Sequence, residues 1–577
     1  MPRSPLVTTR RVFLAHFAGA GLGSSLLPGV LWAKMHEAGV DQVTPDMLRQ
    51  ALVVAGLELG DEDQAAMLSG VNQDLARRAS LREIAIPDDV SPPFHFSPLV
   101  PGMELPASAR ESWPLRRSHP PVERPADLEE AAFWSVTELA ELLRTRQVTS
   151  VELTGMYLAR LRRLDPVLHC VVTFLDDRAM DEARRADAEL EAGRDRGPLH
   201  GIPWGAKDII AVRGHPTTWG SDAYREQVID QDSAVVEMLR DAGAVLVAKL
   251  TTGELAQGDR WFGGQTLNPW NLEEGSSGSS AGPASAVAAG LVGFALGSET
   301  SGSILSPSAR CGVTGLRPTL GRVTRHGVMA LSWTLDRLGP MCRSAEDCAL
   351  VMTAISRPDG RDMSVVDLPF NWDAEMDLRR LRVGVVREAF DEVVDPRMQA
   401  RNAAALRAMR GLGVELVEVG VPDISTDLSP SAVEAATFFD EFMRTGRDRE
   451  MTNPGRAAAW KRSWLTPAVD YLRQQRIRSL MMMELARATA HVDVWLAPRA
   501  TGAPPGQGGG TALQRHWTMA NLATYPAVSV PHGFEPSGSP DALVFYGRPF
   551  GEAELLAVVR GWQEATGFHR ERPSLPS

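Results

Sequence analysis

Short apolar runs that alternate with helical patterns are the feature that most constrains how this chain can fold. Such runs occur at 170–174, 244–248, 381–386 and 414–419, and segments with apolar residues at helical spacing separate them. Strands that alternate with helices pack in layers, with the helices covering a buried sheet. The sequence therefore predicts an α/β protein with an α/β/α layered core.

The first 33 residues have the pattern of an export signal. Arg10 and Arg11 precede an uncharged run from Val12 to Ala33 that is rich in Gly, Ala, Ser and Leu. Paired arginines before such a run are typical of twin-arginine signals, which carry folded proteins across the bacterial inner membrane. We expect residues 1–33 to be this signal and the protein to be periplasmic or secreted. A retained membrane anchor is the alternative, because the run is long enough to span a bilayer.

Two further segments precede the layered core. Residues 34–86 are predicted to form a small helical extension, in which Thr44 and Gly60 stand at typical helix starts. Ten prolines then fall within residues 87–130, which favours an extended connecting strap. The catalytic core is expected to occupy residues 131–577.

Composition excludes several classes of protein. With 44% hydrophobic and 23% charged residues, the chain is neither disordered nor fibrous. The net charge of -12, without a dense block of Lys and Arg, argues against a nucleic-acid partner. The four cysteines include no CxxC pair, so they indicate neither a disulfide framework nor a zinc site. We expect no metal and no cofactor, and the sequence leaves the oligomeric state open.

Lysine is rare in this chain, which draws attention to each one. Only four of the 60 basic residues are Lys, and the other 56 are Arg. Arginine keeps its proton inside proteins, whereas a buried lysine can lose it, so a lysine that acts as a base cannot be replaced by arginine. Lys34 lies at the end of the export signal, Lys249 is expected to hydrogen-bond structurally, and Lys461 is interpreted as a solvated charge in an Arg-rich stretch. Lys207 remains the candidate base.

Three Gly- and Ser-rich patches carry the candidate chemistry. Lys207 and Asp208 end a Gly/Pro-rich turn that begins at Gly197, and the other two patches are 275–282 and 297–304. The small residues let backbone approach a substrate closely. Together the patches supply a base, hydroxyl nucleophiles and clustered backbone N–H groups, which is the equipment for acyl transfer.

Three alternatives compete for the patch at 275–282. A flexible linker is disfavoured because the patch continues directly into the apolar run 284–296. A transmembrane helix is disfavoured because the front third of the uncharged stretch is Ser and Gly, so we expect a buried helix after the loop. A nucleophile elbow centred on Ser280 matches G-x-S-x-G, but that motif must follow a buried strand, and residues 268–274 are typical of turn and loop.

The same patches resemble the amidase signature family. The resemblance rests on Lys207-Asp208, the loop at 275–282, the stretch 297–303 with its continuation over 311–322 and 335–340, and the late segment 521–533. It covers the chain from about Ser135 to the C-terminus. It implies an amidase-signature fold with a central mixed sheet, and an amidase that cleaves a carboxylic acid amide into the acid and ammonia or an amine.

The resemblance also implies roles for individual residues. Ser303 would be the nucleophile, Ser279 the bridging serine after a cis peptide bond, and Lys207 the base. The N–H groups of the loop would form the oxyanion hole, namely those of Thr300, Ser301, Gly302 and Ser303. Burial among neutral groups favours the neutral form of a lysine amine, so Lys207 could accept a proton near neutral pH.

The resemblance leaves the substrate and partners open. Where many relatives carry Arg two residues after the nucleophile, this chain has Leu305, which makes acidic amides less suitable substrates through that contact. A small-molecule amide is the expected partner, without stable membrane insertion after signal removal. The alternative within the family is the glutaminase-like A subunit of a tRNA-dependent amidotransferase, although an export signal argues against it.

Overall fold

The computed structural model describes residues 42–84, 122–425, 428–499 and 511–575. The predicted export signal at 1–33 lies outside these residues, and so does most of the predicted strap at 87–130. The localisation and the domain boundaries drawn from them therefore stay predictions. The chain divides into two compact units.

The first unit, the helical unit, contains the N-terminal extension together with residues 428–449 and 453–480. Its helices are α3 (Pro45–Val54), α4 (Asp61–Arg82), α14 (Pro430–Phe438), α15 (Asp440–Arg444), α16 (Gly455–Ser463) and the first part of α17 (Ala468–Thr489). The two predicted helix starts are confirmed. Thr44 caps α3 through its side chain, and Gly60 immediately precedes α4, whose first turn holds three acidic residues.

The helical unit has its own apolar core. Leu48, Ala51 and Leu52 of α3 pack with Met67 and Val71 of α4, and Leu465 joins the same cluster. Leu465 lies about 400 residues away along the chain, between α16 and α17. The apolar face of the extension thus packs against a segment from late in the chain, and the sequence patterns did not predict this contact.

The interpretation of Lys461 as a solvated charge is wrong. Its side chain is buried, and Nζ lies 3.0 Å from Oδ1 of Asp63 and 2.7 Å from Oδ2 of Asp448. On α16 it belongs to the inward face with Ala457 and Trp460. The arginines around it in sequence lie on other parts of the helix surface, so helix geometry and not local composition decides its burial.

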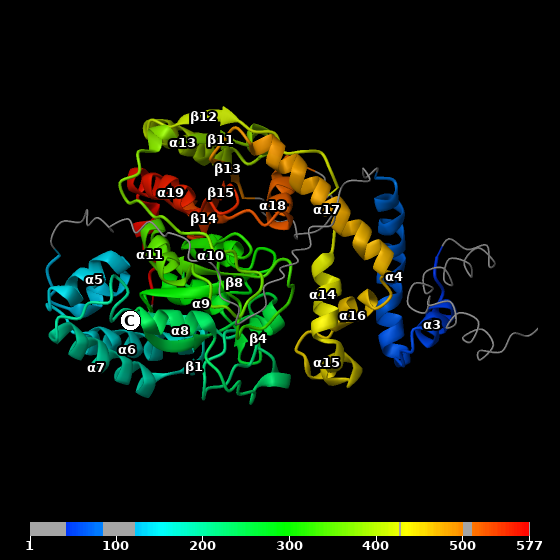
Figure 1. The fold of residues 1–577 in the computed structure, drawn as a ribbon, viewed down its shortest axis with the longest axis horizontal. Coiled ribbons are helices and arrows are strands. Elements are labelled where there is room, and N and C mark those ends of the chain that lie inside the picture. Colours follow the sequence, from blue (N-terminus) through cyan, green and yellow to red (C-terminus); the bar gives the residue numbers. More distant parts are fainter. Residues whose placement is uncertain (1–41, 85–121, 426–427, 500–510, 576–577) are drawn as a thin grey trace, which may run out of the picture. The chain divides into compact units, whose positions relative to one another are not determined.

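The second unit, the sheet unit, is built on an eleven-stranded mixed sheet in the order β1-β3-β2-β8-β10-β9-β14-β15-β13-β11-β12. Figure 1 labels β8, β14, β15, β13, β11 and β12 of this order. The strands are β1 (Val171–Phe174), β2 (Pro203–Lys207), β3 (Val245–Leu250), β8 (Phe294–Glu299), β9 (Thr314–Arg317), β10 (Arg337–Cys342), β11 (Arg382–Val385), β12 (Glu415–Glu418), β13 (Val494–Pro498), β14 (Ala527–Phe534) and β15 (Pro540–Gly547). The four apolar runs noted in the sequence are β1, β3, β11 and β12. Parallel pairing joins β2 to β3 and β8, and the middle of the sheet is antiparallel.

Helices pack against this sheet in two groups, as the predicted α/β/α layering requires. In one group α9 (Ala281–Ala288) and α10 (Leu305–Cys311) contact each other and the central strands. In the other group α11 (Ala345–Ile355) and α19 (Glu552–Thr566) contact each other and the same sheet. Further helices of the unit are α5 (Val136–Arg144), α6 (Ser150–Leu168), α7 (Asp176–Glu191), α8 (Ala234–Asp241), α12 (Arg387–Asp391), α13 (Pro396–Gly411) and α18 (Ala512–Leu522).

Two details of the Gly/Ser region differ from expectation. The apolar run 284–296 is a helix only as far as Ala288, and its end is the central strand β8. Residues 271–275 form a short strand, β7, which pairs with β6 (Leu267–Asn268) in a hairpin outside the main sheet. A tight hairpin uses the same Asn, Pro and Gly residues as a loop, so composition does not distinguish the two. Among the described residues, no helix combines the length and the apolar character needed to cross a membrane.

Candidate active site

Lys207 ends strand β2 in the interior of the sheet unit. Its side chain is fully buried, and Nζ lies 2.7 Å from Oγ of Ser279. The same amine lies 2.9 Å from Oγ of Ser298 and 3.4 Å from its carbonyl oxygen. Because β2 and β8 are parallel, Lys207 and Ser298 reach the same edge of the sheet. Two strand ends thus bring the amine and the hydroxyls together.

Ser279 is held by close backbone packing. It is 1% exposed, its peptide bond to Gly278 is cis, and its carbonyl oxygen accepts a hydrogen bond from the N–H of Gly253 at 3.2 Å. A Cβ on Gly278 would lie 1.8 Å from the carbonyl oxygen of Gly258. Only glycine fits there, so the Gly/Ser composition of this loop reflects packing and not flexibility.

Ser280, the centre of the elbow motif, has a structural position. Its Oγ donates to the carbonyl oxygen of Ser298 and accepts from the N–H of the same residue, both at 3.1 Å. The side chain is fully buried and ties the start of α9 to β8. The strand before the motif is the partly exposed β7 and not a buried strand of the main sheet. Both observations argue against Ser280 as a nucleophile.

Ser303 lies in the loop of residues 300–304, which connects β8 to α10 and is called the nucleophile loop here. Its side chain is half-buried, and its carbonyl oxygen accepts a hydrogen bond from the N–H of Ser280 at 3.0 Å. That bond places Ser303 beside the residue that follows Ser279. Within the described parts of the chain its hydroxyl forms no hydrogen bond. The structure thus joins Lys207 to Ser279 directly, and Ser303 to this pair only through the backbone.

The nucleophile loop presents free backbone donors. The N–H groups of Ser301, Gly302 and Ser303 find no acceptor among the residues that the structure describes. Gly302 has φ +83°, and a Cβ there would meet Oγ of Ser306 at 3.0 Å and the ring of Trp517 at 3.2 Å. A loop whose N–H groups are left unused next to a serine is suited to stabilising an oxyanion.

A buried carboxylate fixes the end of the loop. One oxygen of Glu299 accepts hydrogen bonds from the N–H groups of Ile304 at 2.8 Å and Leu305 at 2.9 Å, and the other pairs with Arg317 at 2.9 Å. Burial alone would raise the pKa of Glu299, but the charges of Arg317 and Arg337 outweigh it and hold the pKa below its ordinary value. Glu299 is therefore ionised and clamps the first turn of α10.

Lys249 forms a structural ion pair, in keeping with the role expected for it. Its Nζ lies 2.7 Å from Oδ1 of Asp208, and both side chains are fully buried. The amine also donates to Oγ1 of Thr217 at 2.9 Å, while Asp208 accepts from the N–H of Thr218. Burial lowers the pKa of Lys249, and the charge of Asp208 opposes the shift.

Several residues at the site were missed by sequence reasoning. Ser298 contacts the amine of Lys207, and Arg317, Arg337 and Asn521 hold the base of the nucleophile loop. Arg317, Arg337 and Asn521 do lie inside the stretches 311–322, 335–340 and 521–533, which carry the family resemblance. Their side-chain roles depend on contacts across about 200 residues of sequence, which no local pattern encodes.

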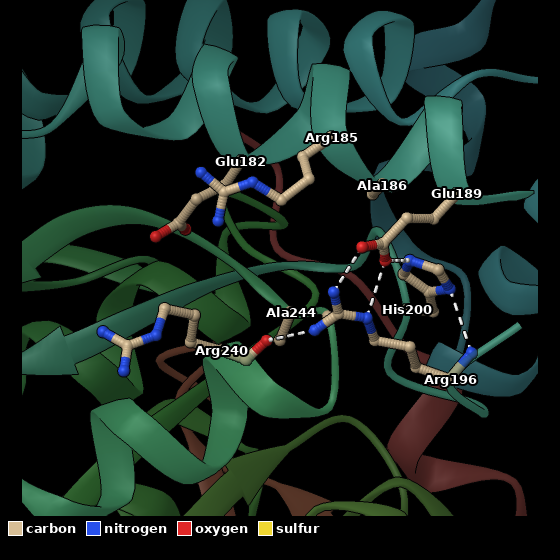
Figure 2. A pocket seen from close by; sticks show the side chains of 9 residues that line it. Glu182, Arg185, Ala186, Glu189, Arg196, His200, Arg240 and Ala244 are labelled. Atoms are coloured by element: carbon tan, nitrogen blue, oxygen red, sulfur yellow. Dashed lines mark hydrogen bonds and ion pairs between the residues drawn. The ribbon is translucent and has the colours of Figure 1, made fainter. Parts of the chain in front are cut away.

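A separate surface pocket contains none of these residues. It is lined by α7, the 196–200 turn and the end of α8, and Figure 2 shows Glu189, Arg196 and His200 of this lining in contact with one another. Arg196 pairs with Glu189, and Glu189 also lies 3.3 Å from Nε2 of His200. Burial lowers the pKa of His200. Among the described residues, those of this pocket included, no group of three or more His, Cys, Asp or Glu side chains is placed to hold a metal ion.

Comparison with known proteins decides the family. The model of the family described as Amidase matches residues 152–556, which include every residue of the candidate site. The chain belongs to the Amidase family. It is an enzyme of the class that cleaves carboxylic amide C–N bonds.

Two kinds of protein that are similar to this amidase bear on its function. The first kind is the A subunit of glutamyl-tRNA(Gln) amidotransferase. The protein of Methylococcus capsulatus is 37% identical, over 76% of this chain and 98% of the relative, and that of Marinomonas sp. is 35% identical with the same coverage. The second kind comes from solved structures, where the peptide amidase of Stenotrophomonas maltophilia has a TM-score of 0.67 at 29% identity, covering 78% of this chain and 99% of its own.

Proposed function

We propose that this amidase hydrolyses a carboxylic amide through an acyl-enzyme on Ser303. The observation that carries the proposal is the contact of 2.7 Å between Nζ of Lys207 and Oγ of Ser279, both of which are buried. A lysine amine next to a serine hydroxyl can act as a base toward it when the amine is neutral.

The proposed first half-reaction forms the acyl-enzyme. Oγ of Ser303 attacks the amide carbon while its proton passes to Ser279, whose own proton passes to Lys207. The carbonyl oxygen becomes an oxyanion held by N–H groups of the nucleophile loop, each of which contributes roughly 3 kcal/mol to the stability of the transition state. The C–N bond then breaks as Ser279 gives a proton to the departing nitrogen and takes one back from Lys207.

The second half-reaction uses water in place of the serine. Water attacks the acyl carbon and gives its proton to the Ser279–Lys207 pair, and the Ser303 ester bond breaks as the proton returns to Oγ of Ser303. The products are a carboxylic acid and ammonia or an amine, and the enzyme regains its starting state.

The test is turnover and covalent labelling together. Purified protein should release ammonia or amine from a panel of aliphatic and aromatic amides, and Ser303→Ala should lower turnover by roughly 10⁴-fold or more without unfolding the chain. The matched control is Ser280→Ala, which should keep the chemistry. Loss of turnover in Ser280→Ala, with activity retained in Ser303→Ala, would restore the elbow hypothesis.

A second candidate is the A subunit of a tRNA-dependent amidotransferase. The curated relatives favour it over a stand-alone amidase, because they match at 33–37% identity over nearly their whole length. In that role the amide would be glutamine, and the ammonia would pass to a partner subunit. Glutamine therefore belongs in the panel, assayed with and without a tRNA-binding partner. Ammonia release from glutamine only with the partner would favour this role.

We also propose that the protein is exported by the twin-arginine route. The support is the sequence of residues 10–33 alone. Arg10→Lys with Arg11→Lys should leave the protein inside the cell, because the export receptor reads paired guanidinium groups. Cell fractionation measures the result, and equal export of the double variant would show that the arginines are an ordinary basic segment.

A further inference from the structure

The carbonyl group of Thr300, at the start of the nucleophile loop, is held by two buried side chains. Its oxygen accepts a hydrogen bond from Nδ2 of Asn521 at 3.0 Å and another from Nη2 of Arg337 at 3.1 Å. A carbonyl oxygen has two lone pairs, so both of its acceptor positions are filled. The peptide unit between Thr300 and Ser301 cannot rotate without breaking both bonds.

The orientation of the Asn521 amide follows from its neighbours. Its Oδ1 accepts from Nη2 of Arg337 at 2.6 Å and from Nη1 of Arg317 at 3.2 Å. Guanidinium groups only donate, so the amide oxygen must face them and the amide nitrogen must face the Thr300 carbonyl. Asn521 is 3% exposed, so water cannot easily take over these bonds.

Helix α18 brings a second side chain to the same loop. Trp517 lies four residues before Asn521 and therefore on the same face of α18. A Cβ on Gly302 would lie 3.2 Å from the Trp517 ring, so this ring packs closely against the loop at Gly302. Asn521 and Trp517 thus both lie against the nucleophile loop, Asn521 at Thr300 and Trp517 at Gly302.

The carbonyl direction fixes the direction of the next N–H. The only cis peptide bond in the described chain is Gly278–Ser279, so the bond between Thr300 and Ser301 is trans. In a trans peptide the C=O and N–H bonds point in opposite directions. With the carbonyl of Thr300 aimed at Asn521, the N–H of Ser301 points in the opposite direction within the peptide plane, where it has no acceptor among the described residues.

We infer that Asn521 is a positioning residue that aims the N–H of Ser301 at the oxyanion. The inference rests on the proposed function in one respect, namely that Ser303 is the nucleophile of this loop. Asn521 touches no reacting atom in this scheme. It acts through the peptide unit of Thr300 and Ser301, with Arg337 as the second support and Arg317 orienting the amide.

Two variants separate positioning from simple structural support. Asn521→Asp keeps the size and the Oδ1 acceptor, but an ionised carboxylate would oppose the Thr300 carbonyl and favour rotation of the peptide. Asn521→Ala removes the donor and leaves Arg337 in place. Gln514→Ala, at a half-buried position of the same helix whose side chain forms none of these hydrogen bonds, is the matched control.

The primary measurement is the second-order rate at which a fluorophosphonate probe labels Ser303, read by intact mass and peptide mapping. In labelling, the Ser303 Oγ–P bond forms, the P–F bond breaks, and the transition state needs the same oxyanion donors as the amide reaction. We expect roughly a 100-fold lower rate for Asn521→Asp and roughly tenfold for Asn521→Ala. Gln514→Ala should label like the wild type.

A melting curve and steady-state kinetics complete the test. Positioning requires that kcat falls by about the same factor as labelling, while KM changes by less than about threefold. Should Asn521→Asp fail to fold, Asn521→Ala provides the measurement. Folded Asn521 variants that label within about twofold of the wild type would overturn the inference, as would a loss of labelling wholly accounted for by a smaller folded fraction.

Failure of this inference is distinguishable from failure of the proposed function. A wild-type protein that labels at Ser303 but hydrolyses no amide of the panel would refute the proposed function, while the labelling rates would still judge Asn521. A wild-type protein that does not label at Ser303 would overturn both.

Discussion

The sheet unit and the helical unit each bury a lysine that stands in an unusually arginine-rich chain, and the two lysines have different surroundings. Lys207 of the sheet unit places its amine 2.7 Å from Ser279 and 2.9 Å from Ser298, both through hydroxyl oxygens. Lys461 of the helical unit places its amine within 3.0 Å of the carboxylates of Asp63 and Asp448. A carboxylate stabilises the charged amine and a hydroxyl does so less, so burial alone does not identify a base. What distinguishes the two lysines is the partner.

The largest effect that tests this comparison is expected at Lys207. Lys207→Arg should lower kcat by roughly 10³-fold or more and be as inactive as Lys207→Ala, because arginine keeps its proton under all relevant conditions. Ammonia release from the best amide of the panel measures it, with a melting curve to show that the variant is folded. An active Lys207→Arg enzyme would refute the proposed base.

The next largest effect is expected at Lys249, whose carboxylate partner is Asp208. Lys249→Met should lower the free energy of unfolding by about 3–5 kcal/mol, because it leaves the Asp208 charge buried without its cation. Denaturant unfolding measures the loss. Adding Asp208→Asn to the same chain should recover much of it, and a double variant no more stable than Lys249→Met would show that the ion pair is not the cause.

A smaller effect is expected at Lys461. Lys461→Met should cost about 3 kcal/mol, the lower end of the range at Lys249, because the buried Asp448 loses its cation whereas Asp63 is 23% exposed and keeps Arg449 at 3.6 Å. The kcat of the sheet unit should stay within about twofold of the wild type. Lys461→Arg keeps the charge and should lose less stability. A large fall in kcat in either folded variant would mean that Lys461 contributes to the chemistry.

The smallest effect tests the same rule on a carboxyl group. Burial raises the pKa of Asp347 to about 7, although the charge of Arg343 opposes the shift. The folded chain therefore binds more protons than the unfolded chain between about pH 4 and pH 7, and its stability falls as the pH rises through that range. Asp347→Asn should remove this pH-dependent loss of stability, because an amide does not ionise. The new amide oxygen can still accept the hydrogen bond from the N–H of Val136.

The expected gain from Asp347→Asn is about 1 kcal/mol at pH 8. The pKa shift alone would allow about 4 kcal/mol, but the new amide nitrogen is itself buried and needs an acceptor. The gain should shrink toward pH 4, where the aspartate is protonated or nearly so in both states. Melting midpoints at pH 5, 6, 7 and 8 measure it, and a gain that does not depend on pH would contradict the assignment.

Much of the fold followed from the sequence because its signals are local. The apolar runs at 170–174, 244–248, 381–386 and 414–419 became strands, and Thr44 and Gly60 preceded helices, since periodicity and capping act within a few residues. The joining of the extension with Leu465 could not be foreseen. It depends on two apolar surfaces that meet across about 400 residues, and many pairings of such surfaces satisfy the same hydrophobic pattern.

The sequence by itself determined the family, through Lys207 and the motifs around Ser279 and Ser303. A reaction that needs particular side chains at particular spacings produces motifs that can be recognised in the sequence. Only the tertiary structure decided which lysine meets hydroxyls and which meets carboxylates. It also decided that Asn521, about 220 residues beyond Thr300, holds the nucleophile loop. The physical reason is that an amine, an amide or a carboxylate takes its properties from the groups within about 3 Å, and those neighbours come from distant parts of the chain.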